Sequence, residues 1–145
     1  KFEQDGMKQM KLQSTIEKWN KISKPQLELD GQWLMAGRVS ENKEQRRDIT
    51  RPRKTMKFLK DGFFQWIAFN TETFQFFGSG GGYYSAEEER YTEYIEYFSR
   101  NNTSVGRVLP FEYSISGIDW HHQGFSSKGD PIHEIWSTRV GLKNE

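Results

Sequence analysis

The 145-residue chain contains no cysteine and no long hydrophobic run. Without cysteine it cannot be a disulfide scaffold, a thiol-dependent enzyme or a thiolate metal site. Its apolar stretches are only a few residues long, whereas a membrane-spanning helix needs about 20. Lys and Arg number 21 against 20 Asp and Glu, so the net charge of +1 provides no global field for nucleic acid or an anionic membrane. We therefore expect no nucleic-acid partner and no membrane span, and recognition of any partner by a local site.

Aromatic residues are abundant instead. Phe, Tyr and Trp make up 15% of the chain, nearly half of its 34% hydrophobic residues. A chain of this length folds as one domain and buries roughly 70% of the surface that its unfolded state exposes. The sequence therefore predicts a single core filled by a few large rings.

The first part of the chain has a helical pattern. Leu12, Ile16 and Trp19 fall at positions i, i+4 and i+7, which predicts an amphipathic helix over residues 7–22, and Lys24-Pro25 ends it. We expect residues 1–25 to form a helical extension and residues 26–145 a separate β domain. Because the chain opens with Lys1 rather than Met, we also expect that a targeting segment has been removed.

Beyond Pro25 the chain consists of short β-like runs separated by turn residues. Short connections without intervening helices favour an all-β, antiparallel up-and-down barrel, because closure leaves no exposed strand edge. A single large sandwich is the competing architecture. The eight expected strands cover residues 32–39, 55–59, 63–69, 74–84, 91–98, 105–115, 120–123 and 132–140.

Two short motifs stand at the ends of this β region. Gly31-Gln32-Trp33 opens the first expected strand, and Arg139 lies near the end of the last. This arrangement resembles the lipocalin-like, or calycin, pattern. The resemblance implies that Trp33 and Arg139 stack and close the barrel floor, a contact that a planar cation over an indole makes favourable.

Residues 57–64, 78–82 and 120–131 are similar to a group of secreted bacterial lipocalin-like proteins of unknown function. The resemblance covers about Asp30 to Arg139. It implies a lipocalin-like barrel and export, and hence a secreted or periplasmic location in the cell envelope.

The glycine run Gly78-Ser79-Gly80-Gly81-Gly82 lacks the Lys-Ser/Thr of a phosphate-binding loop. No helical pattern follows whose amino terminus would hold an anion. We expect the glycines to permit a bulge or sharp coil in a strand of a closing barrel, and we expect no cofactor.

Three histidines lie near the carboxyl end of the chain. His121 and His122 are adjacent and would point to opposite faces of a strand, whereas His122 and His133 would meet across neighbouring strands as an incomplete zinc site. Histidines paired with carboxylates on a barrel surface are ordinary, so we expect no metal. No nucleophile elbow surrounds any serine, and we expect no catalytic residue.

The aromatic residues are the best functional lead, since Phe64 and Trp66 share one face of a strand. If the barrel is incompletely filled, these side chains line a pocket; if it is filled, they form a solid core. The basic segment 46–54 supplies Arg51 and Arg53 as anion contacts, or else is simply a solvated connection. The expected ligand contacts are Phe64, Trp66, Tyr84, Phe111, Tyr113 and Trp120.

These observations lead to one function hypothesis and two alternatives. The first is a non-enzymatic, exported domain that holds a small, partly apolar ligand in an aromatic-lined barrel. The second is a filled barrel that serves as a protein-interaction or structural module of the envelope, with Ile16 and Trp19 as docking residues. The third is a hydrolase or isomerase that uses His122 or His133 with Glu134 as acid and base.

Overall fold

The structure is a computed structural model that describes residues 15–19 and 27–138. Its regular elements are nine β-strands and one short 3₁₀ helix, η1 (Asn102–Ser104). The strands are β1 (Gly31–Ser40), β2 (Lys43–Arg46), β3 (Arg53–Lys60), β4 (Phe63–Asn70), β5 (Phe76–Glu87), β6 (Arg90–Phe98), β7 (Val108–Ser116), β8 (Asp119–Phe125) and β9 (Pro131–Thr138).

Eight of these strands form a closed antiparallel barrel. Strands β3 to β9 follow one another in chain order, and β1 pairs with both β3 and β9, which closes the ring. The prediction of an all-β, eight-stranded barrel is confirmed, and the sandwich alternative is wrong.

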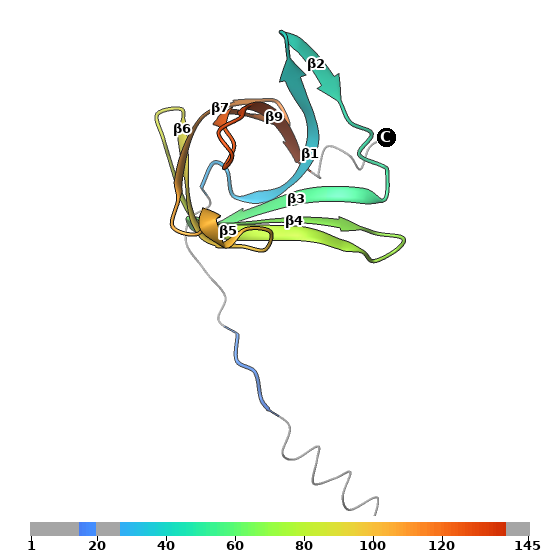
Figure 1. The fold of residues 1–145 in the computed structure, drawn as a ribbon, viewed down its shortest axis with the longest axis vertical. Coiled ribbons are helices and arrows are strands. Elements are labelled where there is room, and N and C mark those ends of the chain that lie inside the picture. The colour runs from blue at the N-terminus through green and yellow to red at the C-terminus, as the bar shows by residue number, and fades with distance from the viewer. Residues whose placement is uncertain (1–14, 20–26, 139–145) are drawn as a thin grey trace, which may run out of the picture.

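The ninth strand, β2, was not expected from the sequence. It pairs with the second half of β1 through the register Gly37↔Arg46 to Ser40↔Lys43, and the β1–β2 hairpin projects from the barrel (Figure 1). All four residues of β2 are exposed, so the strand has no apolar face that a hydrophobic pattern would reveal.

The strands alternate between the barrel interior and its outer surface. Residues paired directly across an antiparallel ladder point to the same side, and the series Leu59↔Phe64↔Gly82↔Ile95 runs around the interior. The β3–β4 turn illustrates why the chain reverses where it does. Asp61 and Gly62 have φ values of 52° and 83°, the paired positive values that a two-residue hairpin turn requires.

One end of the barrel, which we call the floor, is closed by packed side chains. Leu29 is fully buried there, and its carbonyl accepts a hydrogen bond of 2.8 Å from Trp33 Nε1. The Trp33 and Trp120 rings meet edge to face with centroids 5.4 Å apart. The turns after β3, β5 and β7 lie at this end; the opposite end, which we call the mouth, carries the connections after β4, β6 and β8.

The expected amino-terminal helix over residues 7–22 lies largely outside the described residues. Its described part, residues 15–19, is not helical, and Ile16 and Trp19 are 83% and 87% exposed. The helix prediction therefore has no support from the structure. Arg139 also lies outside the described residues, so the expected contact between Trp33 and Arg139 stays a prediction.

Candidate functional site

The barrel interior contains a cavity of about 210 Å³ toward its mouth. Its polar lining includes Lys57, Glu93, His122 and Glu134, which come from four different strands. Its apolar wall consists of Met35, Trp66, Ile95, Phe98, Leu109, Phe111, Ile132 and Trp136.

A buried ion pair spans the interior beside this cavity. Lys57 Nζ lies 2.7 Å from Glu93 Oε1, and the two side chains are only 5% and 8% exposed. The Tyr91 hydroxyl donates a second hydrogen bond of 2.9 Å to the same carboxylate oxygen. The ammonium group also lies 4.8 Å from the ring centroid of Trp136 and 5.2 Å from that of Trp120. These contacts compensate the free-energy cost of removing both charges from water. A buried ion without a partner would have no such compensation.

Sequence reasoning missed this ion pair, although a signal for it was present. Lys57 shares strand parity with the inward-facing Leu59, and Glu93 shares parity with Tyr91 and Ile95. Two opposite charges at inward positions of different strands indicate a buried pair, but the sequence does not give the pairing register that brings them together.

His122 and Glu134 form a second polar pair in the cavity. They are directly opposite on β8 and β9, with His122 Nε2 and Glu134 Oε1 4.0 Å apart. Burial lowers the pKa of His122 well below its ordinary value, and the charge of Lys57 lowers it further. Burial raises the pKa of Glu134, which Lys57 partly offsets. Among the described residues, His122 Nδ1 is buried without a hydrogen-bond partner.

The structure separates the expected ligand contacts into two groups. Trp66 and Phe111 line the cavity. The remaining aromatic residues lie in the packed core or toward the floor, where the Tyr113 hydroxyl donates a 3.0 Å hydrogen bond to Glu28 Oε2. Strand parity indicated which residues share a face. It did not indicate at which height along the barrel axis the side chains cease to fill the interior. The four residues away from the cavity lining are Phe64, Tyr84, Tyr113 and Trp120.

The two expected anion contacts also differ in their surroundings. Arg51 is in the loop after β2, with its Nε 3.7 Å from Asp48 Oδ2. Arg53 opens β3 at the mouth, and its Cζ lies 3.5 Å from the centroid of the Phe77 ring. Only Arg53 therefore stands at the rim of the barrel on a strand that contributes to the cavity wall.

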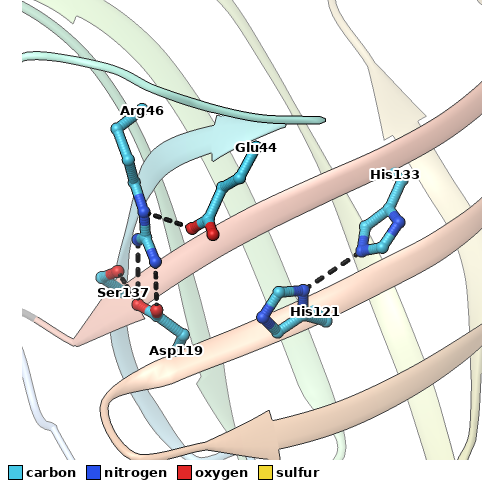
Figure 2. Close-up of polar contacts among 6 residues, drawn as sticks. All are labelled: Glu44, Arg46, Asp119, His121, His133 and Ser137. Carbon is cyan, nitrogen blue, oxygen red and sulfur yellow. Dashed lines mark hydrogen bonds and ion pairs between the residues drawn. The ribbon is translucent and has the colours of Figure 1, made fainter. Parts of the chain in front are cut away.

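A separate polar group occupies the outer face of β8 and β9 (Figure 2). His121 Nδ1 and His133 Nε2 lie 3.1 Å apart. The expectation that His122 meets His133 is wrong, because the register pairs Gln123 with His133 and puts His122 on the inner face. Among the described residues, no group of three or more His, Cys, Asp or Glu side chains is arranged to hold a metal ion.

Beside these histidines, Arg46 of the projecting hairpin contacts the barrel wall. Its guanidinium lies 2.5 Å from Glu44 and 2.5 Å from Asp119, and Ser137 donates a hydrogen bond to Asp119 (Figure 2). The hydrogen bond from Arg46 lowers the pKa of Asp119. Arg46 thus has a structural role in attaching the β1–β2 hairpin.

Comparison with protein families gives one match. The family described as "Domain of unknown function (DUF4488)" matches residues 28–145. The chain belongs to this family. The DUF4488 match includes all nine strands and every residue that lines the cavity. Comparison with curated proteins finds no match. No helix among the described residues of this DUF4488 domain is long and apolar enough to cross a membrane.

Proposed function

We propose that this domain is a non-enzymatic, lipocalin-like (calycin) binding module that holds one small, partly apolar ligand inside its barrel. The observation that carries the proposal is the cavity of about 210 Å³ beneath the mouth. Eight-stranded barrels leave an interior that side chains fill or that holds one small ligand. Here the aromatic side chains fill the interior at the floor and leave a space unfilled toward the mouth.

The size of the cavity limits the ligand. An apolar cavity of about 150 Å³ binds benzene, whereas pockets for drug-sized molecules measure about 300–1,000 Å³. A space of about 210 Å³ therefore suits one ring with a short polar substituent. The ring would contact Trp66, Phe98 and Leu109, and the polar groups on β8 and β9 would orient the substituent.

Binding is favoured over acid–base catalysis by the state of His122. Its side chain is 2% exposed and its pKa lies well below the ordinary value, so it is neutral and poorly matched to proton transfer near neutral pH. His133 faces outward, away from Glu134. The cavity likewise favours a ligand carrier over a filled module that acts only through its surface. The resemblance to secreted bacterial lipocalin-like proteins supports an exported location.

A substitution that fills the cavity tests the proposal. Leu109 lines the cavity, and its neighbour Val108 is 54% exposed on the outer side of the same strand. We expect para-cresol, titrated into ¹⁵N-labelled protein, to shift the amide and indole resonances of the cavity wall. Leu109→Trp should weaken binding by at least about tenfold, because the added ring occupies the space that the ligand needs.

The matched control is Val108→Trp, which adds the same ring on the outer face and should leave the titration unchanged. Thermal melting of both variants establishes that each is folded. The proposal would be wrong if no single-ring probe shifted these resonances, or if the two variants weakened binding equally.

A further inference from the structure

Three arginines from three successive parts of the chain converge at the mouth. Arg38 of β1 is directly opposite Glu134, a cavity-lining residue, and therefore points to the inner side. Arg53 of β3 has the same parity as Thr55 and Lys57, which also line the cavity. Arg47 follows β2, and its backbone N–H donates a 2.8 Å hydrogen bond to the Ala36 carbonyl, which holds it beside β1.

These three guanidinium groups differ from the neighbouring arginines in forming no ion pair. Among the described residues, none of Arg38, Arg47 and Arg53 forms an ion pair, in contrast to Arg46 and Arg51 in the same part of the chain. Burial lowers the pKa of Arg47, and the charges of Arg38 and Arg53 lower it further, against an opposing effect of Glu134. The fold thus holds like charges together at the mouth, and Glu134 only partly offsets them.

A fourth arginine extends this group around the rim. Arg53 stacks on the ring of Phe77, and Arg100 Nε donates a 3.0 Å hydrogen bond to the Phe77 carbonyl. Arg100 Cζ lies 5.9 Å from the ring of Trp66, which lines the cavity. We call Arg38, Arg47, Arg53 and Arg100 the rim arginines. They lie at the mouth, outside the set of residues that line the cavity, and Arg100 approaches one of its rings.

We propose that the ligand is a small carboxylate with a single ring, bound with its ring in the cavity and its carboxylate against the rim arginines. This inference rests on the proposed binding function. Guanidinium groups bind carboxylates through two parallel N–H···O bonds, and such charge-assisted bonds are about twice as strong as neutral ones. A ligand with one negative charge also fits better than a dianionic phosphate, because Glu93 and Glu134 already bring two carboxyl groups to the cavity.

The test compares two probes of equal shape, phenylacetate and phenylacetamide, by isothermal titration at neutral pH. We expect phenylacetate to bind about tenfold or more tightly than the amide, since hydrogen bonds to charged groups contribute more than neutral ones. Added salt should weaken phenylacetate binding and leave the amide unaffected, because the rim is open to solvent.

Substitutions of the rim arginines test whether these residues cause the preference for the acid over the amide. Arg47→Gln and Arg53→Gln should each reduce the preference for the acid at least about threefold, with little change in amide affinity. Arg90→Gln is the control, because Arg90 begins β6 at the floor end and is not a rim arginine. If loss of the Phe77 stacking contact unfolds Arg53→Gln, the charge-preserving Arg53→Lys replaces it and should retain most of the preference.

The outcomes separate the two proposals. Equal affinity for the acid and the amide would overturn the carboxylate assignment and leave cavity binding intact. Failure of both probes and of para-cresol would overturn cavity binding itself. An acid preference that the Arg90 control reduces as much as the rim variants would show that general surface charge, and not the rim, attracts the anion.

Discussion

At the scale of the residue, the interior of this barrel differs from an ordinary hydrophobic core in the number of ionisable groups it contains. Lys57, Glu93 and His122 are each less than 9% exposed. The charges of Lys57 and Glu93 compensate each other, whereas His122 has no charged partner in hydrogen-bonding contact and is kept neutral by its burial. Neutral His122 therefore makes stability depend on pH.

The direction of that dependence follows from the pKa shift. The folded-state pKa of His122 lies below the ordinary value of 6.5 at which the unfolded chain titrates. Between the two values the unfolded chain binds a proton that the folded protein excludes, so the free energy of unfolding falls as the pH drops below about 6.5. We expect the wild type to lose up to about 1.4 kcal/mol per pH unit in this window relative to His122→Phe.

Urea unfolding of both proteins at a series of pH values measures this difference. Phe has a similar shape and can contact the neighbours of the imidazole, Tyr91 and Phe111, but it does not titrate. His121→Phe is the control. Because His121 points outward, this variant should show the same dependence of stability on pH as the wild type. Parallel pH profiles for the wild type and His122→Phe would contradict the assignment of this effect to His122.

Residue-level chemistry was only partly accessible from the sequence. Parity showed that Trp66 shares a strand face with Phe64, yet the structure places one at the cavity and the other in the floor core. The difference depends on the tilt and stagger of the strands around a closed barrel, which fix the height of each residue along the axis. No local pattern in one chain encodes that height.

At the scale of the element, β5 and β6 are shaped by close approach of their backbones. The register between them shifts at Gly81/Gly82, where β6 accommodates an extra residue. A Cβ on Gly82 would collide with the Tyr94 carbonyl oxygen, whereas a Cβ on Gly78 would meet the side chain of Arg100. The expectation that the glycine run serves the coil of a strand agrees with this bulge.

This difference between the two glycines gives a prediction. Gly82→Ala should lower the free energy of unfolding by at least about 1–3 kcal/mol, because backbone atoms of β6 must shift to relieve the collision. Gly78→Ala should cost less, because a flexible arginine side chain can move aside. Chemical denaturation of the two variants measures both changes. A Gly78 variant as unstable as the Gly82 variant would show that chain flexibility, and not the backbone collision, sets the cost.

Most elements could be predicted from the sequence, because short β-like runs are separated by turn residues. β7 is an example, with Leu109 and Phe111 on one parity between the turns on either side. β2 could not be predicted, since its four exposed residues are polar and their pairing depends on the preceding half of β1. The expected amino-terminal helix has no support from the structure: its described residues, 15–19, are not helical, and the rest of it lies outside the described residues.

At the scale of the whole molecule, stability depends on closure of the ring between its first and last barrel strands. Trp33 lies at this junction: it is opposite Thr138 of β9 and Lys57 of β3, and it packs on Trp120. Because β1 and β9 each lack one barrel neighbour until they pair, closure completes the ladder, and the barrel should unfold as one unit.

We therefore expect Trp33→Ala to lower the free energy of unfolding by about 3–5 kcal/mol, a large part of the about 5–15 kcal/mol available to a domain. Near- and far-ultraviolet circular dichroism should report the same single transition. Trp33→Phe, which keeps a ring beside Leu29, should cost less. An unchanged melting curve for Trp33→Ala would place the stabilising contacts elsewhere.

The exchange of partners along β1 has a geometric consequence for the mouth. β1 pairs with β3 only through Gly31–Leu34 and then with β2 from Gly37 onward, so the Arg53–Thr55 segment of β3 has β4 as its sole ladder neighbour. The barrel wall is thus slit on one side, from the rim down to the level of Met56. On its other side the hairpin stays bound to the wall, because Gly37 and Arg38 pair with Ile135 and Glu134 of β9 and Arg46 contacts Asp119 of β8. Outward movement of the hairpin would break these contacts, so the entrance keeps its width only while the hairpin stays bound to β8 and β9.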